Sequence, residues 1–80
     1  MKPDDRRLLW RCRRGTHELD LVLERYCRES IAHWSPLERQ SFEVLIELPD
    51  PLLIDWIFGA IAPPPEYRMH IRNMRRESPD

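Results

Sequence analysis

The sequence predicts an all-α protein, a compact five-helix bundle that forms a single domain over residues 1–80. Eight prolines and two glycines separate five segments, and apolar residues within each segment recur at the three- or four-residue spacing of a helix. No segment shows the two-residue alternation that is typical of a strand. The predicted helices span approximately residues 4–14, 16–32, 36–48, 51–59 and 65–77. Helices of this length are marginal alone, so we expect tertiary packing to hold them.

The first predicted helix begins beside Pro3, which suits a helix start because proline lacks an N–H that would be unsatisfied there. Leu8 and Cys12 lie one turn apart and are expected to face the core. Gly15 fits the left-handed position that ends many helices, and Thr16 is then expected to cap the second helix. The apolar stripe of the second helix consists of Leu19, Val22, Leu23, Tyr26 and Cys27.

The third and fourth helices carry clear start signals. Ser35 and Glu38 form a capping box around Pro36, and Asp50 is expected to cap the fourth helix before Pro51. The residues expected on the buried faces of these two helices are Leu37, Phe42, Leu45, Ile46, Leu48, Leu52, Leu53, Trp56, Ile57 and Ala60. The fifth helix follows three prolines, with Tyr67, His70 or Ile71, and Met74 at helical spacing; residues 78–80 are expected to form a frayed tail.

Composition and charge exclude several classes of protein. The 13 Lys and Arg residues balance 14 Asp and Glu residues, whereas a dedicated nucleic-acid-binding domain is normally basic. No apolar run approaches the roughly 20 residues of a membrane-spanning helix, and the N-terminal residues do not resemble a secretory signal. We therefore expect a cytoplasmic protein with no membrane attachment. Free thiols are the default expectation for Cys12 and Cys27, with one disulfide between them as the alternative.

The first helix has an unusual outer face. If Leu8 and Cys12 face the core, Trp10 points to the opposite side, toward solvent. The arginines three and four positions away from it are Arg6, Arg7, Arg13 and Arg14. One interpretation is that arginines shield the indole ring by cation–π contact. The other is a docking face, because Trp and Arg are common anchors of interfaces. The pattern alone favours neither.

The segment from Arg14 to Glu18 is the second candidate for a functional site. Its simplest interpretation is structural, a turn followed by the start of a helix. No catalytic triad, glycine-rich phosphate loop or metal-ligand pair is present in the sequence. We therefore predict neither an enzyme nor a metal site. A basic face on the last helix, most simply a solvated helix end, is formed by Arg68, Arg72, Arg75 and Arg76. The residues alone indicate a helical interaction module.

The run from Leu9 to Asp20 resembles the signature of a known family, the SdhE family of FAD assembly factors, also called succinate dehydrogenase assembly factor 2. That family carries an Arg-Gly-x-x-Glu motif between its first two helices, and here the motif is Arg14, Gly15 and Glu18. The resemblance continues in the third and fourth helices at Phe42, Leu45, Glu47, Asp50, Pro51, Leu53 and Trp56.

This resemblance implies an assembly factor that binds the flavoprotein subunit of succinate dehydrogenase, or of fumarate reductase, and promotes covalent attachment of FAD to it. The motif residues would lie at the contact with that partner, and we extend the contact to neighbouring residues of the first helix. The full expected partner-binding surface is Trp10, Arg11, Arg13, Arg14, Gly15 and Glu18. FAD would belong to the client, and we expect no cofactor to be bound tightly, because so small a domain offers little room for a deep pocket.

Two other interpretations stay open from the sequence. The main alternative is a small regulatory or antitoxin-like module that binds nucleic acid or another protein through its basic helix faces; binding to nucleic acid would weaken steeply with salt. A third interpretation is a small enzyme that uses Cys12 or Cys27 as a nucleophile. It requires an exposed, reactive thiol.

Overall fold

A computed structural model describes residues 2–76 and confirms the all-α bundle. The described chain contains five α-helices, two short 3-10 helices and no strand. The α-helices are α1 (Pro3–Arg11), α2 (His17–Ser30), α3 (Pro36–Leu45), α4 (Asp50–Ile57) and α5 (Arg68–Arg76). The 3-10 helices are η1 (Ile31–His33), which continues α2, and η2 (Pro65–Tyr67), which leads into α5.

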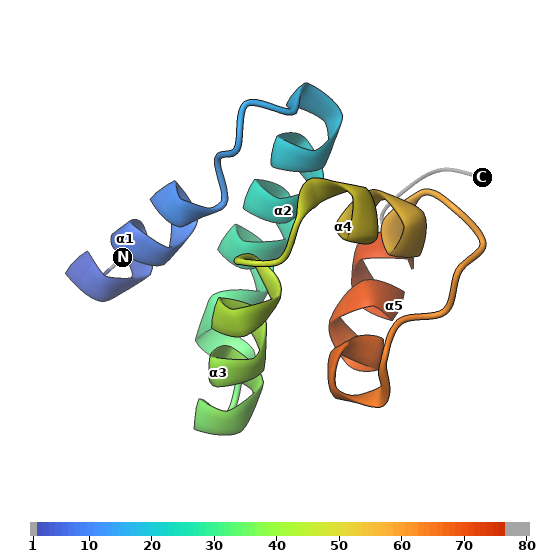
Figure 1. The fold of residues 1–80 in the computed structure, drawn as a ribbon. Coiled ribbons are helices and arrows are strands. Elements are labelled where there is room, and N and C mark those ends of the chain that lie inside the picture. Colours follow the sequence, from blue (N-terminus) through green and yellow to red (C-terminus); the bar gives the residue numbers. More distant parts are fainter. Residues whose placement is uncertain (1, 77–80) are drawn as a thin grey trace.

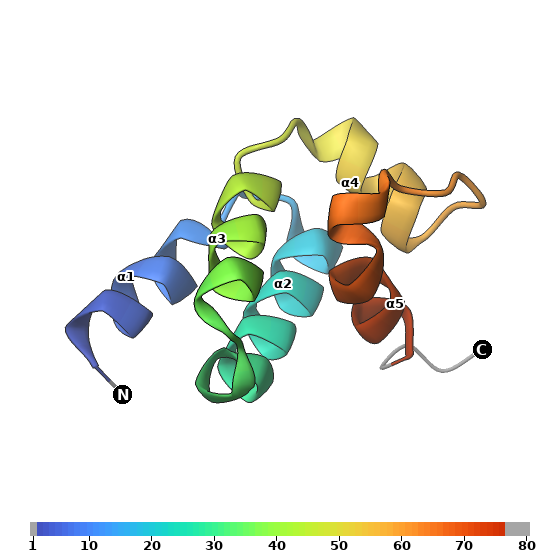
Figure 2. The same ribbon diagram turned by 90° about the horizontal axis from the view of Figure 1, so that it is seen from below.

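The longest helix, α2, lies at the centre of the bundle. It contacts α1, α4 and α5, and α4 and α5 also contact each other. Helix α1 lies at one end of the molecule, whereas α4 and α5 form the other end (Figure 1, Figure 2). The loop between α1 and α2 and the loop between α3 and α4 lie on the same side of the bundle in Figure 1. This arrangement brings the start of α2 close to the start of α4, which becomes important for the candidate site.

The core is a single cluster to which all five helices contribute. It agrees with most of the predicted apolar faces, and both cysteines lie within it as free, buried thiols. The buried hydrophobic residues are Leu8, Cys12, Leu19, Leu23, Tyr26, Cys27, Ile31, Phe42, Leu45, Ile46, Leu53, Trp56, Ile57, Ile71 and Met74. Hydrogen bonding with Cys27 and burial raise the pKa of the Cys12 thiol above its ordinary value, which makes that thiol a poor nucleophile.

Four rings meet in the middle of this core. Tyr26, Trp34, Phe42 and His70 are all in mutual contact, with ring centroids 4.7–5.8 Å apart. The His70 Nε2–H donates to the Glu38 carbonyl oxygen at 2.9 Å, so Nδ1 accepts from the Tyr26 hydroxyl. Burial lowers the pKa of His70, and the neutral ring therefore joins α2, α3 and α5.

The end of α1 and the start of α2 differ from the prediction. Helix α1 ends at Arg11 rather than at Arg14, because the backbone N–H groups of Arg14 and Gly15 donate to the Asp20 carboxylate instead of continuing the helix. Thr16 occupies the N-cap position of α2, but its hydroxyl makes no capping bond to that helix. The hydroxyl donates to the carboxylate of Asp50, in a different helix.

The other helix boundaries also differ from the predicted ones by a few residues. Helix α2 ends at Ser30, where the chain tightens into η1, and α3 ends at Leu45 rather than at residue 48. The expectation that Asp50 caps α4 was wrong: Pro49 is the N-cap, and the helix runs from Asp50 to Ile57 instead of over 51–59. Helix α5 proper starts at Arg68, after η2; Glu77 and the predicted tail lie outside the described residues.

The capping box at the start of α3 is confirmed. Ser35 Oγ accepts from the Glu38 backbone N–H at 3.1 Å, and the Glu38 carboxylate accepts from the Ser35 N–H at 2.8 Å. Three residues expected on buried faces are exposed instead, namely Leu37, Leu52 and Ala60. Leu37 and Leu52 lie in the first turns of α3 and α4. Their exposure shows that helical spacing alone was not sufficient to predict burial.

Candidate partner-binding site

The loop between α1 and α2 is held in an unusual backbone conformation. Gly15 has a φ of 88°, in the left-handed region that the sequence predicted, and its N–H and that of Arg14 both bond the Asp20 carboxylate, at 3.0 and 2.9 Å. A Cβ added at Gly15 would meet nothing within 4 Å in the described chain. Glycine is therefore needed here for its backbone angle, and the space in front of it is open.

The side chain of Arg14 points into the protein. Its Nη1 donates to the Leu48 carbonyl oxygen and to Asp50 Oδ1, both at 2.8 Å, and only 14% of the side chain is exposed. Thr16 donates to the other carboxylate oxygen of Asp50 at 2.7 Å. Hydrogen bonds from Thr16 and Arg14 lower the pKa of Asp50. Arg14 therefore fastens the start of α2 to the junction between α3 and α4.

Glu18, the last residue of the motif, is placed differently. It lies in the first turn of α2 with its side chain exposed. No ion pair or side-chain hydrogen bond to it is found among residues 2–76. An acid suits this position because the N-terminus of a helix carries partial positive charge. The carboxylate therefore suits the helix start and, among the described residues, has no partner that would prevent it from accepting bonds from another molecule.

Beside Glu18 the surface is hollowed. A pocket of about 380 Å³ lies between the start of α2 and the end of α4. Its walls are formed by Thr16, His17, Glu18, Leu19, Ile54 and Phe58. Ile54 and Phe58 remain 36% and 44% exposed, although both are large apolar residues. Sequence analysis missed these two residues; their four-residue spacing, which adds a second apolar edge to α4, was the available signal.

The predicted outer face of α1 is confirmed. Trp10 is 68% exposed, and the Arg13 guanidinium lies over its ring at 4.8 Å from the centroid. Arg13 also pairs with Glu24 of α2, with 3.3 Å between Nε and Oε1. The cation–π contact is thus present, and the exposed ring leaves the docking interpretation open as a prediction.

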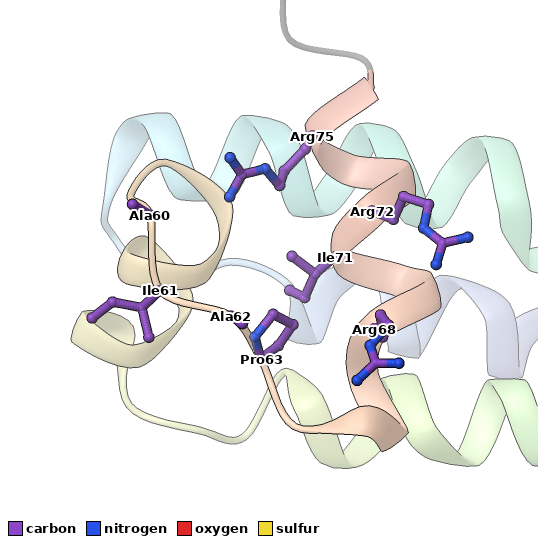
Figure 3. Close-up of a pocket in the computed structure, with 8 residues that line it drawn as sticks. All are labelled: Ala60, Ile61, Ala62, Pro63, Arg68, Ile71, Arg72 and Arg75. Carbon is purple, nitrogen blue, oxygen red and sulfur yellow. The ribbon is translucent and has the colours of Figure 1, made fainter.

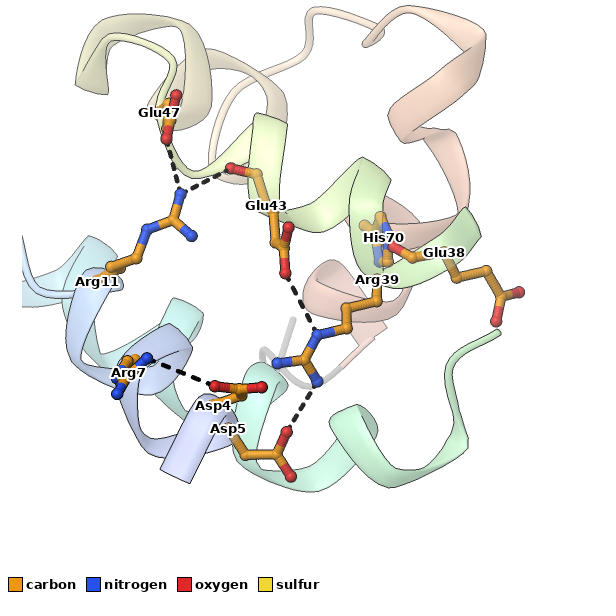
Figure 4. A network of polar contacts seen from close by, with 9 residues as sticks. All are labelled: Asp4, Asp5, Arg7, Arg11, Glu38, Arg39, Glu43, Glu47 and His70. Carbon is orange, nitrogen blue, oxygen red and sulfur yellow. Dashed lines mark hydrogen bonds and ion pairs between the residues drawn. The ribbon is translucent and has the colours of Figure 1, made fainter. Parts of the chain in front are cut away.

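Arg11 is occupied within the chain. Its Nη2 donates to the Glu47 carboxylate at 2.7 Å and to the Glu43 carbonyl oxygen at 3.4 Å, both on the α3 side of the molecule (Figure 4). A second bridge joins the same two helices, since Arg39 of α3 donates to Asp5 of α1 at 2.8 Å (Figure 4). Arg11 therefore holds α1 against α3, in addition to any contact that it makes with a partner.

The six predicted site residues therefore fall into three groups. Arg11 and Arg14 use their guanidinium groups to join helices within the chain. Trp10 and Arg13 form a stacked pair on the surface of α1. Gly15 and Glu18 lie exposed at the α1–α2 loop and the first turn of α2. The structure adds Asp20 and Asp50 as the carboxylates that hold the motif. The sequence had suggested Asp50 only as a helix cap.

The structure also shows basic residues of α5 at the surface, in a hollow that shares no residue with the pocket beside Glu18. Arg68, Arg72 and Arg75 line a hollow of about 490 Å³ together with Ile71 and the loop of residues 60–63 (Figure 3). Arg75 Nη1 donates to the carbonyl oxygens of Trp56 and Gly59, each at 2.9 Å. These two hydrogen bonds join the end of α4 to α5, so Arg75 stabilises the packing of the two helices.

Neither metal chemistry nor a membrane span emerges from residues 2–76. No group of three or more His, Cys, Asp or Glu side chains in this part of the chain is placed to hold a metal ion. Among the described helices, none combines the length and the apolar character needed to cross a bilayer.

Comparison with known proteins matches almost the whole chain to one family. The family profile described as flavinator of succinate dehydrogenase (Sdh5) matches residues 6–77. The FAD assembly factor SdhE of Coxiella burnetii is 38% identical over 74 residues, which cover 91% of this chain and 90% of the relative. The SdhE of Legionella pneumophila (strain Lens) is 40% identical over 60 residues, and that of Methylococcus capsulatus 44% identical over 57 residues. These alignments cover 75% and 71% of this chain, and 76% and 69% of the relatives.

The comparison with solved structures finds no significant match. The match of the family profile and the similarity to the Coxiella relative each extend over nine-tenths of the sequence, from α1 into α5. They agree with the family resemblance that the Arg14, Gly15 and Glu18 motif indicated. The chain belongs to the Sdh5 family, the flavinators of succinate dehydrogenase.

Proposed function

We propose that this protein is a cytoplasmic assembly factor that binds the flavoprotein subunit of succinate dehydrogenase and promotes covalent attachment of FAD to it. Membership of the flavinator family carries this proposal. The subunit of fumarate reductase is proposed as a second client. The protein is not itself an enzyme in this scheme, because the flavin and the histidine of the client supply the reacting atoms.

The proposed mechanism is positional. By binding the client, the protein favours a conformation in which the client's histidine and the flavin ring are aligned for bond formation. Holding reacting groups in one geometry removes an entropic cost from the barrier and needs no catalytic side chain in the assembly factor. FAD stays with the client, and we propose that the isolated protein binds neither FAD tightly nor nucleic acid specifically.

The proposed contact surface contains Glu18 and Gly15 directly. Glu18 supports this role by its exposed carboxylate, and Gly15 by the open space in front of its backbone. Arg14 would act through Asp50, as a positioning residue that keeps the loop in place. Trp10 and Arg13 would contribute an aromatic and cationic anchor at the edge of the surface, which suits the residue types that dominate interfaces.

The test is covalent flavin fluorescence of the flavoprotein subunit in a denaturing gel. The subunit is co-expressed with this protein, with its Glu18→Ala variant, with its Gly15→Arg variant and with no assembly factor. We expect strong fluorescence only with the natural sequence. A loss of signal counts only for variants whose helical circular dichroism shows that they are folded at the temperature of the experiment.

Glu29→Ala is the matched control, because Glu29 is also an exposed glutamate of α2 but lies at its other end. It should support flavinylation as well as the natural sequence does. Equal fluorescence in every lane, under conditions in which flavinylation is not saturated, would overturn the proposal for this client. Salt-sensitive DNA binding by the isolated protein would then move the regulatory alternative forward.

A further inference from the structure

The pocket beside Glu18 has no assigned role, and it lies next to the exposed end of the motif. It is bounded by the first turn of α2 on one side and, on the other, by Ile54 of α4 and by Phe58, which directly follows that helix. Leu19 forms part of its lining and is fully buried, so the base of the hollow belongs to the hydrophobic core. The pocket is therefore apolar at its base and along the α4 wall, with one carboxylate at its edge.

The two residues of the α4 wall are exposed on the side of the helix that is turned away from the core. The core contacts of α4 are made by Leu53, Trp56 and Ile57, whereas Ile54 and Phe58 are left partly in water. Exposed apolar surface beside a polar rim is typical of interaction sites, and aromatic side chains are favoured as anchors. Covering these two side chains would remove apolar area from water, at about 25 cal/mol per Å².

The negative charge of Glu18 at the edge of the pocket favours a ligand that carries a positive charge. The Glu18 carboxylate is exposed and has no ion-pair partner within residues 2–76. A lysine or arginine from outside the chain would be attracted to it, and a second carboxylate would be repelled. A ligand that fits both features carries an apolar side chain next to a basic one on a protein surface.

The walls of the pocket are also held in place. Arg14 and Thr16 bond the two carboxylate oxygens of Asp50, at 2.8 and 2.7 Å, which ties the first residues of α2 to the first turn of α4. A preformed pocket does not lose binding energy in ordering its own walls. The two charged residues of the motif therefore differ in role. Arg14 holds the walls of the pocket in place through Asp50, and Glu18 lies at its edge, where it would contact the ligand.

We infer that this pocket binds an apolar side chain of the flavoprotein subunit, with a neighbouring lysine or arginine of the subunit paired to Glu18. The inference rests on the proposed function and deepens it by extending the contact from the motif onto α4. A standard interface buries about 800 Å² on each partner, so the pocket anchors a larger surface and does not form all of it. Leu21, one turn beyond Glu18 and half exposed, continues the surface along α2.

Phe58→Ser and Ile54→Ser are the informative variants, and Leu37→Ser is the matched control. Leu37 is also a large apolar residue and is 77% exposed, but it lies on α3 and does not line this pocket. Binding of each purified variant to the purified flavoprotein subunit is measured by titration calorimetry. We expect Phe58→Ser to weaken binding by about tenfold or more, as the loss of an interface anchor does, and Leu37→Ser to change it by less than about twofold.

A thiol-labelling experiment provides a second readout that does not depend on a loss of affinity. The natural cysteines are buried, so a cysteine introduced by Phe58→Cys would be the reactive thiol of the described chain. It should react with a maleimide in the free protein and be protected when the flavoprotein subunit is bound. The thiol introduced by Leu37→Cys should remain reactive in both states.

The outcomes separate the two proposals. If the natural protein does not bind the flavoprotein subunit at all, the proposed function fails, and the pocket inference fails with it. If the natural protein binds but the Phe58→Ser and Ile54→Ser variants bind equally well, or the Phe58→Cys thiol stays fully reactive in the complex, the proposed function stands and the pocket inference is overturned.

Discussion

At the scale of single residues, Arg14 and Gly15 are adjacent in the motif but are needed for different physical reasons. Gly15 supplies a backbone angle, since its φ of 88° lies in the region that other residues rarely adopt. Arg14 supplies two hydrogen bonds that reach the chain more than 30 residues away. A change at either position alters the shape of the loop before it alters any contact with a partner.

Replacing Gly15 by alanine should destabilise the fold by about 1–2 kcal/mol, the cost of placing a Cβ in the left-handed region. The space around the residue is open, so backbone strain and not a clash is the cause. Urea unfolding measures the free-energy difference. Gly15→Asn is the control, because asparagine tolerates this region better and should lose less. An alanine variant as stable as the natural protein would show that the loop changes its conformation without cost.

Replacing Arg14 by methionine should destabilise the fold by about 2 kcal/mol, since hydrogen bonds to charged groups contribute about 1.5–3 kcal/mol. The substitution leaves the Asp50 carboxylate without its cation and the Leu48 carbonyl oxygen without this donor. Thermal unfolding of Arg14→Met, of Asp50→Asn and of the double variant that combines them tests the pairing. The double variant should recover part of the loss; if the two losses simply add, the pair is not coupled in solution.

At the scale of elements, His70 ties three helices together as a neutral ring. Its folded pKa is lowered from the ordinary value of 6.5, first of all by burial. A lowered pKa in the folded state means that the unfolded chain binds the proton more readily. The stability that His70 contributes is therefore present above pH 6.5 and is lost as the pH falls below 6.5 toward the folded pKa.

We expect the free energy of unfolding to decrease between pH 7 and pH 5, within the range set by the lowered pKa of His70. Urea unfolding at half-unit steps measures the slope. His70→Gln keeps an amide donor and acceptor but does not titrate, so its profile over this range should be flatter. His33→Gln, the same substitution at an exposed position, is the matched control variant. An unchanged slope in His70→Gln would assign the pH dependence to other groups.

Helix α1 is held by both packing and charge, and these contribute unequally. Leu8 is buried in the core, whereas the Arg11–Glu47 pair lies at the surface. Leu8→Ala should cost about 2–5 kcal/mol because it leaves a cavity. Arg11→Ala should cost less than about 1 kcal/mol, the range of exposed ion pairs. Thermal unfolding ranks the two variants, and the reverse order would mean that α1 is held mainly by its bridges to α3.

At the scale of the whole molecule, a single small core supports a surface of several distinct kinds. The motif loop and the Glu18 pocket lie where α2 meets α4, the Trp10–Arg13 pair lies on α1, and the arginine-lined hollow lies on α5. Helix α2 runs through the centre and contacts α1, α4 and α5, so it connects the elements that carry these surfaces. Such a scaffold suits the positional role proposed for this protein.

Much of the fold was determined locally by the sequence. The five helices, the capping box at Ser35 and the left-handed turn at Gly15 depend on residues within about four positions of one another, where spacing and capping rules apply. The burial of both cysteines also followed from helical periodicity. The exposure of Trp10 agrees with its predicted position opposite Leu8 and Cys12, which depended on these two residues facing the core. These features could be predicted because short-range chemistry is sufficient to specify them.

Only the tertiary structure decided which motif residues face inward and which face outward. Arg14 and Glu18 are both charged residues beside one turn, but Arg14 turns inward because its acceptors, Leu48 and Asp50, lie 34 and 36 residues away in the sequence. Helix α1 ended early for a local reason, the bonds from the Arg14 and Gly15 N–H groups to Asp20. The long-range bonds from Arg14 and Thr16 instead occupy the carboxylate of Asp50, which had been expected to cap α4. The pocket at Ile54 and Phe58 exists because α2 and α4 are joined there, and helical spacing within one segment cannot reveal a space between two.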